Sequence, residues 1–112
     1  MKTSFPIIGL QNNSSVLKGF DLFQNYPNPF NPVTNIRFDI PLSRGVSEGW
    51  GVLTKLVIYD LLGREIIKLV DKELESGTYS VDWDALNYPS GVYFCKLEAG
   101  DFTKSMKMLI IK

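Results

Sequence analysis

The side chains that carry most protein chemistry are scarce in this sequence. It contains no histidine, which removes the usual general base near neutral pH and the commonest transition-metal ligand. Cys95 is the only cysteine, so neither an intrachain disulfide nor a zinc cluster can form. Its neighbours Tyr93, Phe94 and Leu97 favour a small buried residue over a nucleophile. The sequence therefore predicts no catalytic centre and no cofactor, and we expect a protein that is not an enzyme.

Two carboxylates, Asp82 and Asp84, flank Trp83 near the end of a predicted strand and could contribute to a calcium site. Calcium sites use about six or more oxygen ligands, and no EF-hand spacing supplies the remainder. Nothing in the sequence selects a carboxylate pair for glycoside hydrolysis. We interpret Asp82 and Asp84 as a solvated turn, with Trp83 in the core, and leave open whether a calcium ion binds there.

The segment Asp60-Leu61-Leu62-Gly63 predicts a hairpin turn, followed directly by Arg64. In such a turn Asp60 accepts backbone hydrogen bonds, and Gly63 supplies a positive φ. The Arg64 guanidinium could bind the carboxylate of a partner bidentately, or it could form an exposed salt bridge within the fold. Both alternatives are open from the sequence.

Charge and hydrophobicity exclude two classes of partner. Twelve basic and twelve acidic residues give a formal net charge of zero, so we expect no binding to nucleic acid. No apolar run approaches the roughly 20 residues that span a bilayer as a helix, so we expect a chain that does not span a membrane. Pro6 and Gly9 interrupt the apolar start, which argues against a signal peptide. Export would therefore depend on a signal in a longer parent protein.

The elements that must position these residues are strands. We predict one domain over residues 19–112, preceded by a linker or disordered segment over residues 1–18. After residue 19, short segments alternate with period two between turn-forming residues. The predicted strands cover residues 20–24, 35–40, 54–59, 65–70, 78–83, 92–98 and 102–111. Seven strands at this spacing predict an all-β, immunoglobulin-like antiparallel β-sandwich, with a small barrel as the alternative.

The segment Tyr26-Pro27-Asn28-Pro29-Phe30-Asn31-Pro32 precedes the second predicted strand. Each proline fixes its own φ, lacks an N–H and pushes the preceding residue toward extended geometry. The segment could therefore brace the adjacent strand and block intermolecular pairing at a sheet edge. Alternatively, Tyr26 and Phe30, partly exposed on a rigid backbone, could act as anchors in the groove of a receptor.

Several ordered segments together resemble one protein family. They are Tyr26-Pro27-Asn28-Pro29-Phe30-Asn31-Pro32, Thr34-Asn35-Ile36-Arg37-Phe38, Val57-Ile58-Tyr59-Asp60-Leu61-Leu62-Gly63-Arg64-Glu65, Gly77-Thr78-Tyr79-Ser80-Val81-Asp82-Trp83-Asp84, Ser90-Gly91-Val92-Tyr93-Phe94 and Lys107-Met108-Leu109-Ile110-Ile111-Lys112. This set resembles the C-terminal sorting domain of type IX secretion cargo proteins, or Por secretion tail, over residues 20–112. Some of its motifs are shared with the immunoglobulin-like domain of the flagellar hook-capping protein. The connection over residues 43–51 is longer than the family leads us to expect.

The resemblance implies a non-catalytic C-terminal secretion and cell-surface sorting signal of a larger exported bacterial protein. The signal would be recognised by the type IX outer-membrane translocon, and a surface peptidase would cut in the preceding linker, here residues 11–18. The parent domain would precede this chain, and the product would be secreted or held at the cell surface after crossing the periplasm and the outer membrane. The implied recognition residues are Tyr26, Pro27, Asn28, Pro29, Phe30, Asn31, Pro32, Gly63, Arg64, Gly91, Lys107, Met108, Leu109, Ile110, Ile111 and Lys112.

Two other functions fit a β-sandwich of this kind. A structural or adhesion module, such as a stalk or a hook-cap-like domain, would need the last six residues only for stability. A carbohydrate-binding module attached to an enzyme would need an exposed aromatic platform, for which Trp50 is the obvious candidate. In isolation, the long edge strand over residues 102–111 could also pair with a second copy of the chain.

Overall fold

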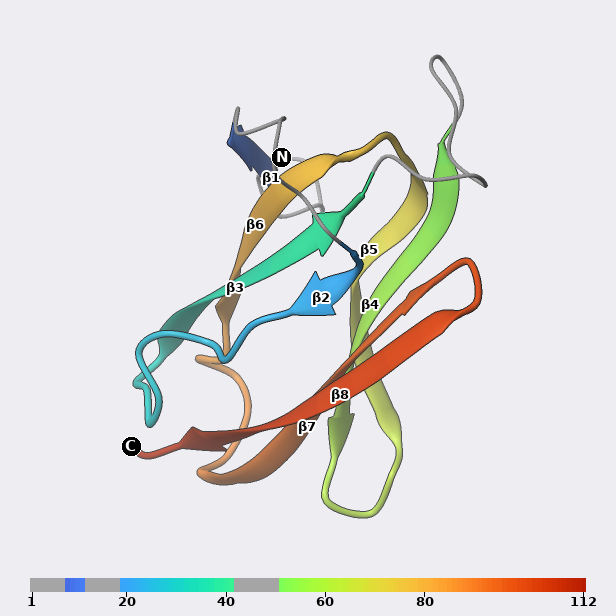
Figure 1. Ribbon diagram of the computed structural model, residues 1–112. Coiled ribbons are helices and arrows are strands. Elements are labelled where there is room, and N and C mark those ends of the chain that lie inside the picture. Colours follow the sequence, from blue (N-terminus) through green and yellow to red (C-terminus); the bar gives the residue numbers. More distant parts are fainter. Residues whose placement is uncertain (1–7, 12–18, 42–50) are drawn as a thin grey trace.

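A computed structural model describes residues 8–11, 19–41 and 51–112, which form strands and no helix (Figure 1). None of these residues therefore belongs to a helix that could cross a membrane. The strands are β1 (Ile8–Gln11), β2 (Asp21–Leu22), β3 (Val33–Ile40), β4 (Val52–Asp60), β5 (Glu65–Leu74), β6 (Gly77–Asp84), β7 (Gly91–Ala99) and β8 (Phe102–Ile110).

The strands form two antiparallel sheets that pack face to face. Sheet A has the order β1-β6-β3-β2, and sheet B has the order β5-β4-β7-β8. Strands β2 to β8 correspond to the seven predicted strands, so the β-sandwich predicted from the sequence is confirmed. Edge strand β2 is shorter than predicted, because only Asp21 and Leu22 pair with β3.

The sequence did not predict β1, which pairs with β6 at the edge of sheet A. It lies within the segment expected to be a linker or disordered. The rest of that segment lies outside the described residues, as does the predicted long connection before Gly51, including Trp50. The domain start at residue 19 remains a prediction.

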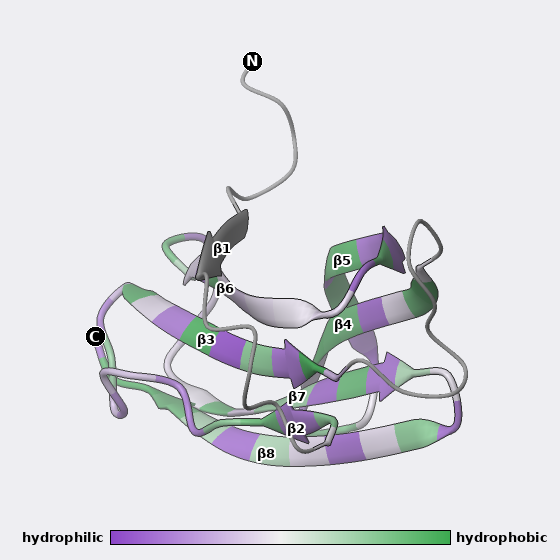
Figure 2. Ribbon diagram, turned by 45° about the horizontal axis from the view of Figure 1, so that its top comes forward, coloured by the Kyte–Doolittle hydropathy of each residue, from purple (hydrophilic) through white to green (hydrophobic). Residues whose placement is uncertain are grey.

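The core lies between the two sheets and follows the predicted alternation. In β3 the buried side chains are Ile36, Phe38 and Ile40, and Figure 2 shows the matching alternation of hydrophobic and hydrophilic residues along this strand. Sheet B contributes a facing set that is fully buried: Leu56, Ile58, Cys95, Leu97, Met108 and Ile110. Burial of each such side chain contributes on the order of 1.5–3 kcal/mol, so the sequence pattern directly determines which face of each sheet is internal.

Trp83 occupies the part of the core nearest the C-terminus. Its ring lies 5.7 Å from Phe30, 5.6 Å from Tyr88 and 5.7 Å from Tyr93, measured between ring centroids. The Tyr93 hydroxyl donates a hydrogen bond of 2.7 Å to the Pro89 carbonyl, four residues upstream, which is the arrangement of a tyrosine corner. Burial raises the pKa of the Tyr93 hydroxyl. These aromatic contacts fix the β6–β7 loop against the end of the sandwich.

Cys95 is fully buried in this core, as its neighbours in the sequence predicted. Desolvation strongly raises the pKa of its thiol, because the apolar surroundings disfavour the thiolate. Cys95 is therefore a small core residue rather than a reactive one.

Candidate functional site

The proline segment, residues 26–32, lies alongside the last part of β8 and pairs with it. The Phe30 N–H donates to the Leu109 carbonyl at 3.0 Å, and the Ile111 N–H donates to the Phe30 carbonyl at 3.1 Å. These bonds form a parallel bridge between Phe30 and Ile110. Two segments that are far apart in the sequence, both predicted to be recognised, are thus joined through their main chains.

Side chains that precede Phe30 extend this contact along the outer edge of β8. The Asn28 side-chain oxygen accepts a hydrogen bond from the Leu109 N–H at 3.0 Å. The Gln24 side chain donates to the Lys107 carbonyl at 2.9 Å. The outward backbone groups from the Lys107 carbonyl to the Ile111 N–H are therefore already occupied. A second copy could pair only with the part of β8 that precedes the Lys107 carbonyl, which shortens the edge available to the predicted dimer.

A buried polar cluster, which the sequence analysis missed, holds the proline segment in place. Asn25 is 2% exposed, and its side-chain amide donates to the Pro27 carbonyl at 3.1 Å and to the Thr34 hydroxyl at 2.9 Å. The Thr34 hydroxyl donates in turn to the Pro27 carbonyl at 2.8 Å. Because prolines leave carbonyls without the neighbouring N–H groups of a ladder, the segment needs such side-chain partners. The sequence signal for this cluster was Asn25, an asparagine directly before the proline segment.

The two aromatic residues of the proline segment have opposite environments. Tyr26 is 81% exposed, whereas Phe30 is 3% exposed. The expectation that Phe30 is partly exposed is wrong, because pairing of its backbone with β8 directs its ring into the core against Trp83. Any part that Phe30 has in recognition is therefore indirect, through the position of its neighbours.

The C-terminal residues are also anchored to the fold. The Lys112 N–H donates to the Ser90 hydroxyl at 2.9 Å, and the Lys112 ammonium donates to the Leu86 carbonyl at 2.6 Å. Met108 and Ile110 are buried as predicted, whereas Ile111 is exposed. The last six residues, predicted to be recognised as a set, therefore divide into an inward-facing and an outward-facing group.

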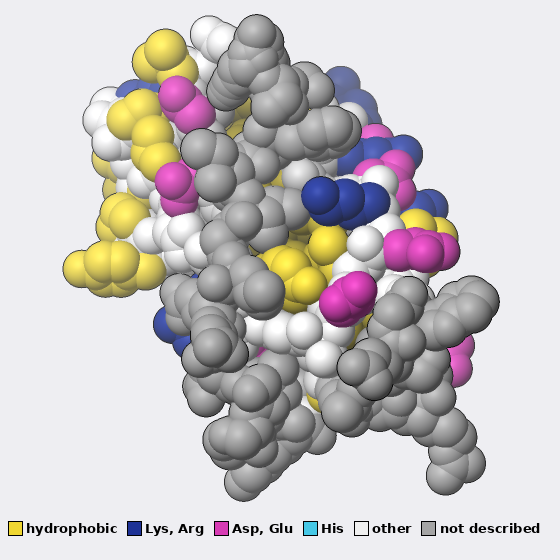
Figure 3. All heavy atoms as spheres, turned by 90° about the horizontal axis from the view of Figure 1, so that it is seen from above, with side chains coloured by type: hydrophobic (Ala, Val, Ile, Leu, Met, Phe, Trp, Pro, Cys, Tyr) yellow, Lys and Arg dark blue, Asp and Glu magenta, His cyan; other side chains and the backbone are white. Residues whose placement is uncertain are grey.

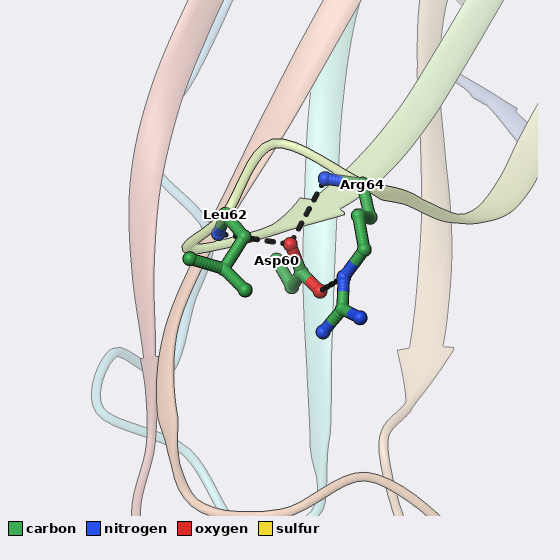
Figure 4. Close-up of polar contacts among 3 residues, drawn as sticks. All are labelled: Asp60, Leu62 and Arg64. Carbon is green, nitrogen blue, oxygen red and sulfur yellow. Dashed lines mark hydrogen bonds and ion pairs between the residues drawn. The ribbon is translucent and has the colours of Figure 1, made fainter.

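The β4–β5 hairpin positions Arg64 at its turn (Figure 4). The Asp60 carboxylate accepts hydrogen bonds from the Leu62 and Arg64 N–H groups, both at 2.9 Å, and from the Arg64 Nε at 2.7 Å. These bonds, with the Arg64 N–H contributing most, lower the pKa of Asp60. Gly63 has a φ of 84°, as the predicted turn requires.

Arg64 forms the salt bridge within the fold that was one of the two alternatives, yet it is not fully used. Its side chain is 73% exposed, and Figure 4 shows its two terminal nitrogens directed away from Asp60. The pair contributes little to stability, because water screens exposed ion pairs. The terminal nitrogens keep the planar geometry that suits a second carboxylate.

Asp82 and Asp84, the residues considered for calcium, do not converge. Asp82 accepts a hydrogen bond from the Asn35 side chain at 2.8 Å, and Asp84 accepts one from the Leu86 N–H at 2.9 Å. Within the described part of the chain, no cluster of three or more metal-ligating side chains is formed.

Two hollows open at this end of the molecule, on either side of the start of β7. The larger, of about 460 Å³, lies between the β4–β5 hairpin and the β6–β7 loop and is lined by Arg64, Tyr88 and Gly91 among others. The smaller, of about 220 Å³, lies between the proline segment and β8 and is lined by Pro29, Lys107 and other residues. Val92 lines both hollows, so β7 links the hairpin residues to the C-terminal residues.

The predicted recognition residues therefore gather at one end of the sandwich. Figure 1 places the C-terminus, the proline segment and the β6–β7 loop together at this end. Figure 3 shows hydrophobic side chains along its left margin, the side on which Figure 1 has the C-terminus. The exposed hydrophobic residues contributed by these segments are Tyr26, Leu86 and Ile111.

Phe20, where the chain enters strand β2, lies at the opposite end of β8. The Phe20 ring stacks on Phe102, the first residue of β8, with centroids 5.4 Å apart. Nearby, the Lys104 ammonium lies 2.7 Å from Asp21, and this hydrogen bond lowers the pKa of the Asp21 carboxyl. Since a strand rises about 3.3 Å per residue, nearly the full length of β8 separates this entry point from the C-terminus.

Comparison with protein-family models agrees with the resemblance seen in the sequence. The model described as secretion system C-terminal sorting domain matches residues 24–112. No curated protein matches the chain.

Proposed function

We propose, from the premise that this chain belongs to the family of secretion-system C-terminal sorting domains, that the type IX machinery recognises the folded C-terminal end of the domain. The domain is a non-catalytic signal that directs secretion through the type IX system. The sorting end, as we call it, consists of residues 26–32, 85–90 and 107–112. The recognised feature would be a composite surface rather than a free linear tail.

The observation that carries this proposal is the main-chain pairing of Phe30 with β8. This pairing makes the position of the proline segment depend on the terminal strand, and the reverse. Lys112 ties the same strand to the β6–β7 loop through Ser90 and Leu86. A receptor that contacts Tyr26, Leu86 and Ile111 would therefore read three segments at once. It would bind only when all of them are folded together.

In this proposal the parent domain precedes the sandwich and is carried across the outer membrane with it. A surface peptidase would then cut before the domain, within residues 11–18, and release the parent protein or leave it at the cell surface. The route would run through the periplasm and across the outer membrane.

Secretion of a reporter tests the proposal. A fluorescent protein with an inner-membrane export signal is fused to the complete chain and expressed in a bacterium that has a type IX system. We expect the reporter outside the cell with the native domain, and retention in the periplasm when Tyr26→Ala and Ile111→Ser are combined. Both side chains are exposed, so the fold should persist.

The matched control is Leu53→Ser, which removes an exposed hydrophobic side chain near the start of β4. This variant should be secreted like the native domain. Circular dichroism of each purified chain verifies folding. Equal secretion of all three folded proteins would refute a role for the sorting end, and periplasmic retention of the native fusion would refute the wider proposal.

A further inference from the structure

The outer face of sheet B has an apolar area that the core does not use. In the half of the sheet near the sorting end, the outward side chains include Tyr59, Val92, Phe94 and Leu109. Each is half-buried, and none packs against the buried core cluster. Their inward neighbours along the strands, including Ile58 and Cys95, are fully buried. These strands are therefore apolar on both faces, although only one face meets sheet A.

Strand register places these four side chains in contact range of one another. Tyr59 lies opposite Phe94 across the β4–β7 pair, and Val92 lies opposite Leu109 across the β7–β8 pair. Directly opposed residues on antiparallel strands have Cβ atoms about 4.5–5.5 Å apart. We call this group, Tyr59, Val92, Phe94 and Leu109, the outer apolar face. It borders both hollows, because Val92 lines each of them.

Positive and negative charges lie on opposite sides of the outer apolar face. Lys107 lies opposite Phe94 on β8 and forms no ion pair with any residue that the structure describes. Glu65 lies opposite Tyr59 on β5, at the other side. Other nearby charges are compensated within the fold, since Lys96 pairs with Glu98 and Arg64 with Asp60. Among the described residues that border the outer apolar face, Lys107 on the β8 side is thus a cation without an ion pair.

We propose that the outer apolar face, which adjoins the sorting end and shares the outward side of β8 with it, is a second contact surface for the type IX machinery. An extended segment of a partner protein would occupy it, with apolar side chains and a carboxylate placed against Lys107. This inference rests on the proposed function. Apolar contact over Tyr59 and Phe94 would supply the affinity, and Lys107 would set the orientation of the bound segment.

The size of the face favours such a partner over a second copy of the chain. A stable interface buries about 800 Å² on each partner and involves roughly 20–30 residues a side. Four half-buried side chains and their neighbours fall well below that size, which suits a signal that is bound and then released. An anionic membrane surface fits less well, because Glu65 opposite Tyr59 and Glu98 beside Lys96 add negative charge to this side of sheet B.

Matched substitutions on one face test the proposal in the reporter assay described above. Phe94→Thr and Leu109→Thr replace outward apolar side chains with threonine, a β-branched residue that favours strands. The control, Leu53→Thr, lies on the same face of sheet B at the far end of β4. We expect each test variant to reduce the secreted fraction about fivefold or more, as loss of a central contact residue does. The control should secrete normally.

Lys107 supplies an independent test of the carboxylate. Lys107→Gln should reduce secretion modestly, and Lys107→Glu should reduce it several-fold more, because repulsion replaces attraction. Lys55→Gln, on the same face but remote from the sorting end, is the control. If Phe94→Thr fails to fold, Leu109→Thr and the two Lys107 variants still decide the question. Equal effects of Lys107→Gln and Lys107→Glu would overturn the assignment of a carboxylate partner.

The outcomes separate this inference from the proposed function. Loss of secretion in the Tyr26 and Ile111 variant, with normal secretion of every outer-face variant, would overturn the inference alone. Two other occupants would also overturn it. A native chain that sediments as a dimer, with Phe94→Thr as a monomer, would identify a second copy. Binding of the native chain to phosphatidylglycerol vesicles, abolished in Phe94→Thr, would identify a lipid surface.

Discussion

The two sheets of this sandwich bury similar inner faces but present different outer faces. Sheet A is polar outside, where β3 presents Asn35, Arg37 and Asp39 between its buried residues. Sheet B is apolar outside near the sorting end, where Tyr59 and Phe94 lie side by side. One sheet therefore behaves as an ordinary solvent-covered layer, whereas the other retains hydrophobic area that folding does not require.

The edge strands β2 of sheet A and β8 of sheet B also differ, in this case in length. Edge strand β2 of sheet A has two residues, whereas edge strand β8 of sheet B has nine. Long edges invite pairing with other chains, and proteins usually cover or interrupt them. Here the segment that follows β2 crosses to sheet B and covers the end of β8 through Phe30. Sheet A thus supplies the cover, and sheet B supplies the surface that is covered.

Phe30→Ala should have the largest effect on stability, because it breaks this link between the sheets. Loss of a buried phenylalanine ring costs about 3–5 kcal/mol, and the Trp83 ring would lose a contact at 5.7 Å. Urea unfolding of the purified chain measures the change. Tyr26→Ala, in the same segment but 81% exposed, should change stability by less than about 0.5 kcal/mol. Similar losses in the two variants would show that Phe30 does not join the sheets.

Asn25→Ala should have the next largest effect on stability, because it dismantles the buried polar cluster that holds the proline segment in place. The Thr34 hydroxyl and the Pro27 carbonyl would each lose the hydrogen bond that Asn25 donates, although the bond between them remains, and each lost bond costs about 0.5–1.5 kcal/mol. The neighbouring Gln24→Ala removes an exposed amide that donates to the Lys107 carbonyl and to the Asn25 side-chain oxygen, and should cost less than about 1 kcal/mol because Gln24 itself is exposed. A larger loss for Gln24→Ala in urea unfolding would reverse the assignment of the supporting residue.

Substitutions on the outer faces of sheets A and B test whether the two faces contribute differently to stability. Phe94→Thr should cost about 1 kcal/mol, because it removes the aromatic residue that lies opposite Tyr59 in the β4–β7 pair. Arg37→Thr on sheet A should cost about 0.5 kcal/mol or less, since the guanidinium is exposed and lies over Phe23 at 5.3 Å. Thermal unfolding of both variants measures the difference. Equal changes in the midpoint would remove the energetic distinction between the faces.

The sequence allowed the inner faces, but not the outer face of sheet B, to be predicted. In β3 the strict alternation of Ile36, Phe38 and Ile40 with polar residues determines both faces at once. In β4 the inward residues Leu56 and Ile58 were identified correctly, and in β7 only Cys95 was interpreted as buried. The outward residues Tyr59 and Phe94 were not interpreted. The sequence signal was a run of consecutive apolar residues in place of alternation, which is typical of a strand with two apolar faces.

The sorting end could be predicted only in its parts. The turn at Gly63 and the tyrosine corner at Tyr93 depend on residues close in sequence, and local chemistry predicts both. The pairing of Phe30 with Ile110 joins the two ends of the domain, and no local pattern contains it. That pairing also reversed the expected exposure of Phe30. Strand β1 was missed because it has only four residues and includes Gly9, a residue type that is depleted in strands.

The smallest expected effect concerns two carboxylates, one from each sheet. Asp21 in β2 and Asp60 at the end of β4 both have a pKa below the ordinary value of 3.8. The folded state therefore binds fewer protons than the unfolded state near this pH. The stability that each carboxylate contributes is complete above about pH 4 and is lost as the pH falls through the folded pKa. Asp21→Asn and Asp60→Asn should each flatten the acid limb of the thermal unfolding midpoint.

The two carboxylates should respond differently when their cationic partner is removed. A side-chain hydrogen bond from Lys104 is the main cause of the lowered pKa of Asp21, whereas the Arg64 backbone N–H is the main cause for Asp60. Lys104→Gln should therefore raise the titration midpoint of Asp21 substantially. Arg64→Gln should raise that of Asp60 only in part, since the backbone donors remain. Carboxyl chemical shifts followed by NMR from pH 6 to 2 measure both midpoints. Full recovery of the Asp60 midpoint in Arg64→Gln would show that the guanidinium, rather than the turn, holds this carboxylate, and that Arg64 is committed to the fold.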